Sequence, residues 1–380
     1  MIGALAMTLA ALGAAAGSAW ATPYTPADDS QVLAAVPPGA RHAEVATRAA
    51  ASERIDVALP LARFYIKEAR STGDLRFLGY AEAVLTPWVG KSSTFPDALV
   101  LHATILQSRH DFGGALTVLE QALILRPNDS QALLTSATVL RVLGRFDESM
   151  SACRLLSEHA DATVVTLCGE PVRGLTGALP DAYARLRNVP SQGMPNEERA
   201  WRDSELGEMA VRLGREDEAE HWFKNGIQYS PEDFYIRAAY ADLLIRQARF
   251  REALSLLQGR ESLEPLLLRI SIAQKALRDP GLEISRARLG AAFTAEAQRG
   301  DGVHRREESR FLLDVQNDAR AAVKAAQSNW RVQHEVEDIL ILIRAANAAG
   351  DSAAAAPALV FLREHHVEDV RIAAALEKQS

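Results

Sequence analysis

The sequence predicts an all-α fold, a solenoid of helix–turn–helix repeats, and three recurring features support this. Turn residues recur along the chain at His110, Gly144, Gly177, Gly214, Ala248 and Gly350. Five residues after each turn stands a small residue: Ala115, Ser149, Ala182, Ala219, Ala253 and Ala355. A large apolar residue often follows four positions later: Leu119, Leu186, Phe223, Leu257 and Leu359. Glycine ends a helix without steric cost, and a small residue one turn into the next helix lets the two helices pack closely.

Two segments carry this pattern most completely. A tandem repeat of about 34 residues has the spacing W-x2-L-G-x2-Y, then A-x3-F, then P. In 96–127 the positions of this spacing are occupied by Leu99, His102, Ala103, Leu106, Ala115, Leu119 and Pro127. In 200–231 it is matched by Leu206, Gly207, Ala210, Ala219, Phe223 and Pro231. On these residues the chain resembles tetratricopeptide-repeat proteins over about residues 55 to 365. It departs where Leu99 and Asp203 replace a large aromatic residue, where His102 replaces a leucine, and in 263–332, which keeps helix pairs but little of the spacing.

The resemblance implies a right-handed superhelical solenoid whose concave groove holds peptides or partner proteins. First helices line such a groove, which places in it Thr104, Gln107, Thr138, Arg141, Glu208, Arg212, Asp242 and Arg246. Their mixed charge suits a polar peptide or a partner's loop better than an apolar helix. The alternative, that they are ordinary solvated residues, stays open.

The elements follow in chain order. Apolar residues at helical spacing from 43 to 70 and again around Tyr80–Trp88 predict a first helix pair, and 96–158 gives two clear repeats. A third repeat begins near Thr163 and contains Pro171 and Pro180, which weaken it. The Pro- and Gly-containing loop 190–196 permits a bend near 188–198.

The second half continues the stack. Residues 197–258 predict two more repeats, and an apolar helix from 265 to 277 ends at Asp279-Pro280-Gly281. Further helices are expected up to about 298 and then over 304–316, 318–332, 335–349 and 352–365. A last helix near 369–378 has a polar face and suits the capping role that terminal repeats require.

The N-terminal residues predict export. Residues 1–21 form an apolar, uncharged stretch ending in Ala19-Trp20-Ala21, which is typical of a secretory signal peptide cut before Thr22. No Lys or Arg stands near Met1, so an upstream start or an uncleaved anchor stays open. Residues 22–42 predict an extended linker, and 43–380 the solenoid. A periplasmic or secreted protein is expected, without membrane insertion once the signal is removed.

The two cysteines of the chain are predicted to form a disulfide. Cys153 stands four residues after Ser149, at the large-residue position of a second helix, and Cys168 lies early in the next first helix. These helices are neighbours in a tetratricopeptide stack, and an oxidising compartment would close the bond if the Cα atoms lie within about 7 Å. The alternative is two free buried thiols.

Composition and motifs exclude several function classes. A formal net charge of -7 over 380 residues argues against nucleic acid and against an anionic membrane surface. Gly90-Lys91-Ser92 imitates the end of a phosphate loop, but Leu85 stands where its first glycine is needed. His365 and His366 are adjacent and point to different sides of a helix, so they do not predict a metal site. We expect no cofactor, no metal and no catalytic residues.

A second candidate cluster comprises His304, Arg305, Glu308 and Trp330. A tryptophan among polar residues is a binding anchor or a core residue with its N–H satisfied locally, and packing is the preferred interpretation.

The sequence therefore predicts a non-enzymatic exported scaffold that binds a peptide or partner protein in its groove. One alternative is a structural envelope assembly factor that contacts partners by its ends or convex face. Another is an enzyme whose site is assembled from scattered residues, an alternative that no sequence motif supports. The sequence leaves the oligomeric state open.

Overall fold

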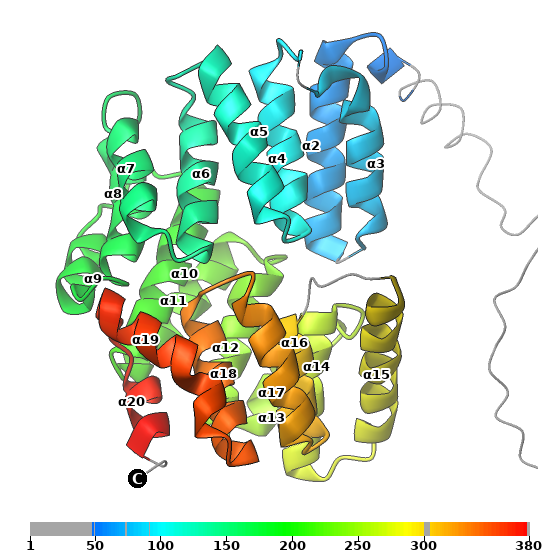
Figure 1. Ribbon diagram of the computed structural model, residues 1–380, viewed down its shortest axis with the longest axis vertical. Coiled ribbons are helices and arrows are strands. Elements are labelled where there is room, and N and C mark those ends of the chain that lie inside the picture. The colour runs from blue at the N-terminus through cyan, green and yellow to red at the C-terminus, as the bar shows by residue number, and fades with distance from the viewer. Residues whose placement is uncertain (1–47, 49, 73, 91, 300–304, 378–380) are drawn as a thin grey trace, which may run out of the picture. The chain divides into compact units, whose positions relative to one another are not determined.

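The computed structural model describes residues 48, 50–72, 74–90, 92–299 and 305–377, and within them every regular element is helical (Figure 1). This confirms the predicted all-α solenoid. The predicted signal peptide and most of the segment before the first helix pair lie outside the described residues.

The helices follow one another as antiparallel pairs. The first half of the solenoid comprises α2 (Ile55–Thr72) with α3 (Arg76–Leu85), α4 (Pro96–Ser108) with α5 (Phe112–Leu125), α6 (Ser130–Val142) with α7 (Phe146–Leu156), and α8 (Ala162–Arg173) with α9 (Leu179–Arg187). A short helix, η1 (Thr86–Trp88), follows α3. The loop for which a bend is predicted connects α9 to the next pair, and the bend stays a prediction.

The second half comprises α10 (Asn196–Arg212) with α11 (Glu216–Tyr229), α12 (Phe234–Arg246) with α13 (Phe250–Leu257), and α14 (Glu264–Leu277) with α15 (Leu282–Arg299). The C-terminal part comprises α16 (Arg305–Arg310) with the π-helical turn η2 (Phe311–Val315), α17 (Ala319–Trp330), α18 (Val336–Ala349), η3 (Ser352–Ala355), α19 (Ala356–His365) and α20 (Val370–Glu377).

The turns have the conformation that the sequence predicts. All six predicted turn residues have positive φ, and His110 and Ala248 adopt it at 58° although they are not glycines. Aspartates cap several helices, both within and between pairs: the carboxylate of Asp111 accepts the N–H of Gly114, and that of Asp233 accepts the N–H of Tyr235. Such caps satisfy backbone donors that the helix itself leaves free.

The small residue in each second helix permits close packing inside the pair. Ser149 is fully buried, and its hydroxyl donates to the carbonyl oxygen of Ala137 on the facing helix at 2.7 Å. In the best-matched repeat, a Cβ added to Gly207 would lie 2.4 Å from the ring of Phe223, so only glycine fits there. Phe223 is 1% exposed and belongs to the largest core cluster of the described residues.

The C-terminal helices return to the middle of the chain. The backbone N–H of His334, just before α18, donates to the carbonyl oxygen of Val142 at 2.7 Å. The ring of Phe361 on α19 packs against that of Phe146 with centroids 5.7 Å apart. In Figure 1 the end of α19 accordingly lies beside α9, and the carboxylate of Glu368, between α19 and α20, accepts the backbone N–H of Leu179 at 2.9 Å.

The packing of the C-terminal helices against the middle of the chain requires a glycine in the turn between α6 and α7. Gly144 has φ of 73°, and a Cβ on it would lie 2.7 Å from the ring of Phe361. Backbone conformation and the neighbouring ring therefore both require glycine at this position.

Candidate functional site

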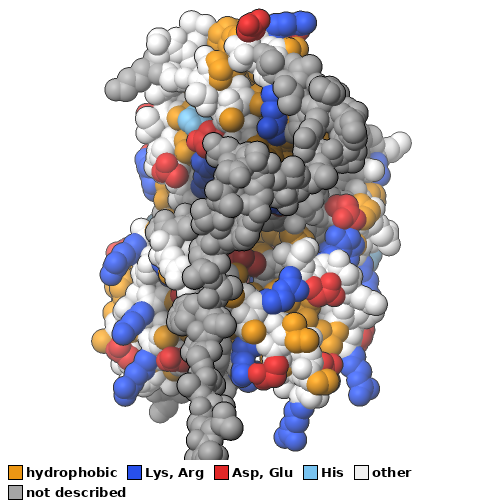
Figure 2. All heavy atoms as spheres, turned by 90° about the vertical axis from the view of Figure 1, so that its right-hand side faces the viewer, with side chains coloured by type: hydrophobic (Ala, Val, Ile, Leu, Met, Phe, Trp, Pro, Cys, Tyr) orange, Lys and Arg blue, Asp and Glu red, His pale blue; other side chains and the backbone are white. Residues whose placement is uncertain are grey.

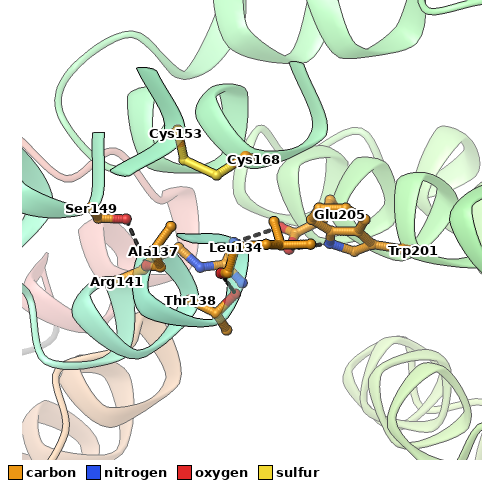
Figure 3. The surroundings of a disulfide bond; sticks show 9 residues. All are labelled: Leu134, Ala137, Thr138, Arg141, Ser149, Cys153, Cys168, Trp201 and Glu205. Atoms are coloured by element: carbon orange, nitrogen blue, oxygen red, sulfur yellow. Dashed lines mark hydrogen bonds and ion pairs between the residues drawn. A yellow bond between two sulfur atoms is a disulfide. The ribbon is translucent and has the colours of Figure 1, made fainter. Parts of the chain in front are cut away.

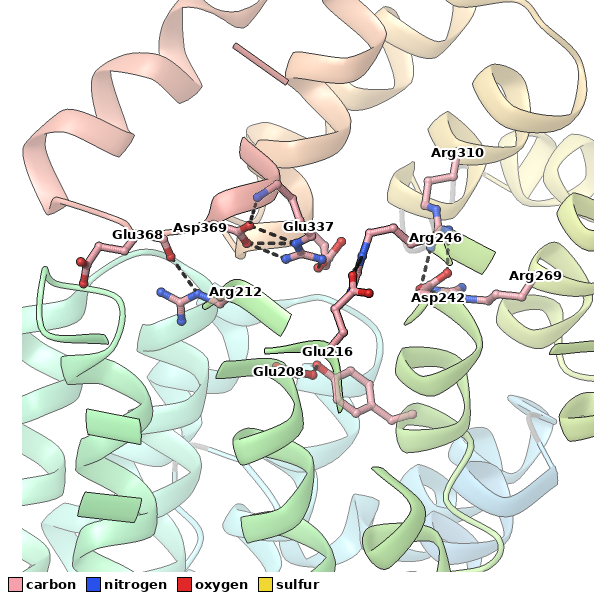
Figure 4. A network of polar contacts seen from close by, with 12 residues as sticks. Glu208, Arg212, Glu216, Asp242, Arg246, Arg269, Arg310, Glu337, Glu368 and Asp369 are labelled. Atoms are coloured by element: carbon pink, nitrogen blue, oxygen red, sulfur yellow. Dashed lines mark hydrogen bonds and ion pairs between the residues drawn. The ribbon is translucent and has the colours of Figure 1, made fainter. Parts of the chain in front are cut away.

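Contacts with the C-terminal helices define an inner face of the solenoid. We use this name for the side of α6, α10 and α12 that is turned toward α16, α18 and α20. Arg212 on α10 contacts Glu368 before α20, and Asp242 on α12 contacts Arg310 on α16. Figure 4 shows their side chains reaching from the first helices toward the C-terminal ones. Six of the eight predicted groove residues come from α6, α10 and α12.

Asp242 joins three successive first helices. Its carboxylate accepts hydrogen bonds from Arg269 of α14 and from Arg310 of α16, each at 2.7 Å (Figure 4). Burial by itself would raise the pKa of Asp242, but the two guanidinium groups outweigh it and hold that pKa well below its usual range. Asp242 is therefore ionised and is a structural junction between repeats.

Arg212 connects the inner face to the C-terminal segment through backbone atoms. It is 7% exposed, and its guanidinium donates to the carbonyl oxygens of Gly174 and Glu368, the latter at 3.2 Å. Burial lowers the pKa of Arg212 to about 10, which leaves it protonated at neutral pH. A predicted groove residue is thus a buried link between α8 and the segment before α20.

The remaining predicted groove residues have simpler surroundings. Arg246 pairs with Glu216 at 3.1 Å. The hydroxyls of Thr104 and Thr138 donate to carbonyl oxygens one helical turn earlier, and Gln107 is half-buried on α4. These side chains lie on the first helices and do not form a separate site.

Tyr235 is an inner-face residue that the sequence analysis did not select. Its side chain is 51% exposed, and its hydroxyl donates to the carboxylate of Glu208 at 2.5 Å. The same position of the preceding repeat holds Trp201, since each stands 18 residues before the small residue of its pair (219−201 and 253−235). The repeat spacing therefore gives Trp201 and Tyr235 the same position, but it does not indicate that the side chain of Tyr235 is exposed.

Glu208 has an unusual electrostatic environment. Burial and the neighbouring carboxylate of Glu205 raise its pKa to about 7, although the hydroxyl of Tyr235 and the charge of Arg141 act in the opposite direction. Glu208 thus takes up a proton near neutral pH.

Replacing Glu208 by glutamine should reduce the pH dependence of stability. The folded-state pKa of about 7 lies above the ordinary value of about 4.3, so the folded protein binds more protons between these values and loses stability as pH rises through them. In urea denaturation, Glu208→Gln should match the wild type near pH 5 and become more stable than it by pH 8. Asp217→Asn removes an exposed carboxylate and serves as control. Parallel pH profiles for wild type and Glu208→Gln would contradict the assignment.

A polar corner lies next to the two cysteines (Figure 3). Arg141 donates to Glu205 at 2.8 Å, and the indole N–H of Trp201 donates to the same carboxylate at 3.3 Å. Cys153 of α7 and Cys168 of α8 are joined by a disulfide with Cα atoms 5.6 Å apart. The structure thus contains the predicted pairing and places it where α8 borders the inner face.

Reducing this disulfide should lower the free energy of unfolding by about 3 kcal/mol for a closed loop of about 15 residues. The loop restricts the unfolded chain, so its loss favours unfolding. Urea denaturation with and without reductant measures the difference, and Cys153→Ala/Cys168→Ala should equal the reduced wild type. Titration of the denatured, unreduced protein should find no free thiol, and two thiols would refute the bond.

The described residues of the second predicted cluster have separate sets of partners. Arg305 pairs with Glu308 at 2.5 Å on α16. Trp330, at the end of α17, packs against the rings of His334 and Phe361 with centroids 4.4 and 5.4 Å away. His304 lies outside the described residues. The environment of Trp330 matches the packing interpretation.

Two kinds of feature are absent from the described residues. None of their helices is long and apolar enough to cross a membrane. Their His, Cys, Asp and Glu side chains form no group of three that could hold a metal ion.

The similarity of this chain to known proteins is low. No protein-family model matches the chain, and no curated protein does. Among solved structures, the human IFIT1 dimer with PPP-AAAA is 14% identical, with 76% of this chain and 69% of that chain covered and a TM-score of 0.47. The P58(IPK) TPR domain is 16% identical (86% and 97% covered, TM-score 0.24), and yeast Tom70 is 11% identical (85% and 96% covered, TM-score 0.25).

The fold is tetratricopeptide-like. The successive helix pairs, the left-handed turn residues and the buried small residue of each second helix carry this conclusion. The tetratricopeptide-like solenoid positions Tyr235, Glu208 and the inner-face charges on neighbouring first helices.

Proposed function

We propose that this protein is a non-enzymatic interaction scaffold that binds a peptide or a loop of a partner protein on its inner face. The observation that carries the proposal is Tyr235, a large aromatic side chain that is half exposed between polar helices and held by its hydroxyl to Glu208. Tyrosine side chains with a fixed polar end are frequent anchors of protein interfaces.

The charges around Tyr235 support a polar partner segment. Glu205 with Arg141 and Glu216 with Arg246 form ion pairs on the same face, so both signs are present within α6 to α12. An apolar helix placed there would remove these pairs from water without compensation. An extended polar peptide could keep them hydrated.

Selection of phage-displayed random dodecapeptides with the full chain tests this proposal. Selected peptides should bind the wild type, and Tyr235→Ala should weaken binding by about tenfold or more, in the range of interface hot spots. Tyr80→Ala is the matched control, because Tyr80 is 39% exposed on α3, away from the inner face. Peptides that bind equally well to Tyr235→Ala would overturn binding at the inner face.

We further propose that the protein is exported to an oxidising compartment. The apolar stretch 1–21 and the pairing of the two cysteines support this. Mass spectrometry of the protein from its own cells should find Thr22 at the N-terminus. An intact Met1 on a cytosolic protein would refute export.

One observation favours the alternative of an assembly factor that uses its outer surface. Ile124 and Leu125 at the end of α5 are 79% and 43% exposed, and Leu155 on α7 is 54% exposed. If this surface binds the partner, Ile124→Ser should abolish capture of the partner and Tyr235→Ala should leave it unchanged.

The surface in Figure 2 shows no preference for one sign of charge. On this face, which carries α3 and α15, blue and red side chains are interspersed with apolar ones wherever the described atoms are visible.

A further inference from the structure

Most charged side chains of the inner face already have a partner of opposite charge. The pairs join first helices to one another, to α11 or to the C-terminal helices, or lie within the C-terminal helices that face them. Their distances are 2.7 to 3.1 Å: Arg141 with Glu205, Arg246 with Glu216, Arg269 and Arg310 with Asp242, Arg306 with Glu335, and Arg371 with Glu337. These pairs are complete within the chain and leave little attraction for a partner's charge.

Glu208 differs from them. Among the described residues, no Lys, Arg or His nitrogen lies within 4.0 Å of its carboxylate, and its hydrogen-bond partner is the hydroxyl of Tyr235. The two cations that act on Glu208 electrostatically have other partners, since Arg141 binds Glu205 and Arg212 binds two carbonyl oxygens. Glu208 is therefore an uncompensated carboxylate at the side of a half-exposed aromatic ring.

We infer that the inner face recognises a basic side chain, a lysine or an arginine of the partner segment, placed against the ring of Tyr235 and the carboxylate of Glu208. This inference rests on the proposed function and names the chemistry of its partner. A cation over a tyrosine face is attracted by the ring quadrupole, and a guanidinium or ammonium group donates charge-assisted hydrogen bonds to a carboxylate.

The groups that face Glu208 from other elements favour the same ligand charge. Glu205 lies on the same helix, and Glu335 approaches from the start of α18. Arg141 of α6 is bound to Glu205, and Arg306 of α16, which faces Tyr235, is bound to Glu335. A carboxylate of a partner would meet uncompensated negative charge here, which disfavours acidic segments.

Protonation of Glu208 makes the affinity for a basic peptide depend on pH. Its pKa of about 7 means that much of the free protein carries a proton there at neutral pH, and a bound cation would displace this proton. Affinity for a basic peptide should therefore rise with pH, by about tenfold from pH 6 to pH 8, as the ionised fraction grows.

The phage selection with the full chain, followed by fluorescence anisotropy of synthetic peptides, tests the inference. Selected peptides should be enriched in Lys or Arg at one position, and replacing that residue by glutamine should weaken binding to the wild type about tenfold. Glu208→Gln should remove this preference, whereas Asp217→Asn on the exposed side of α11 should keep it. Glu208→Lys should select peptides with Asp or Glu instead.

The outcomes separate this inference from the proposed function. Peptides that require Tyr235 but show no basic preference, or a preference that Glu208→Gln leaves intact, would overturn the inference and leave the inner face as a binding surface. Peptides that do not require Tyr235 would overturn both. If Glu208→Gln and Glu208→Lys failed to fold by circular dichroism, the pH profile of the wild type would decide, because an affinity that is flat from pH 6 to 8 contradicts the inference.

Discussion

Replacing Arg212 by methionine should detach the C-terminal segment from the inner face and lower the free energy of unfolding by about 2–4 kcal/mol. The guanidinium of Arg212 donates to the carbonyl oxygens of Gly174 and Glu368, and methionine cannot donate to either. The carbonyl of buried Gly174 left without a donor costs about 1–3 kcal/mol, and the more exposed carbonyl of Glu368 adds less because water reaches it. Removal of a buried charge that has no carboxylate partner offsets part of this loss.

Hydrogen exchange and urea denaturation measure the effect of Arg212→Met. Amides of α20 should exchange much faster in the variant, while amides of α4 and α5 keep their protection. Arg251→Met on α13 is the control, because Arg251 is exposed and its side chain forms no hydrogen bond or ion pair within the described part of the chain. Unchanged protection of α20 would show that Arg212 does not hold the segment.

Replacing Asp242 by asparagine should have the largest effect, a loss of about 3–5 kcal/mol, because it leaves two inner-face arginines without their shared carboxylate. Arg269 is 7% exposed, so its charge has little access to water once Asp242 is neutral. In urea denaturation, the additional change Arg310→Met should recover part of the loss, since one of the unpaired charges is then removed. A loss below about 1 kcal/mol would place Asp242 among ordinary surface ion pairs.

The effect of Asp242→Asn should not depend on pH between 5 and 9. The pKa of Asp242 lies below its ordinary value of about 3.9, so the stability that it contributes is fully present above that value and is lost only as pH falls through the folded-state pKa. A difference between wild type and variant that shrinks between pH 7 and pH 5 would contradict the ionised state assigned to Asp242.

The sequence alone was sufficient for the features that repeat. Turn residues, small residues and helix pairs recur at a fixed spacing, and the packing that they specify is local, as Ser149 and Gly207 show. The cysteine pair could be predicted for the same reason, because Cys153 and Cys168 stand on successive helices of that spacing.

The sequence did not indicate which groove residues are engaged inside the chain. Arg212 and Asp242 were placed on the correct helices, but their partners Glu368 and Arg310 stand far away in the sequence and belong to no repeat position. Tyr235 was missed because its exposure depends on how α12 packs against its neighbours. A single sequence contains no periodic signal for such pairings.

The return of the C-terminal helices has a consequence for how this chain folds and unfolds. Stacked repeats normally touch only their neighbours, so their ends fray and folding spreads from any nucleus. Here hydrogen bonds join residues 191 and 189 positions apart, between His334 and Leu143 and between Glu368 and Leu179. Closing so long a loop is entropically costly and raises the contact order, which slows folding. The same closure ties α20 to the middle of the solenoid, so the C-terminal repeat cannot unravel independently and a kinetic barrier opposes opening from that end.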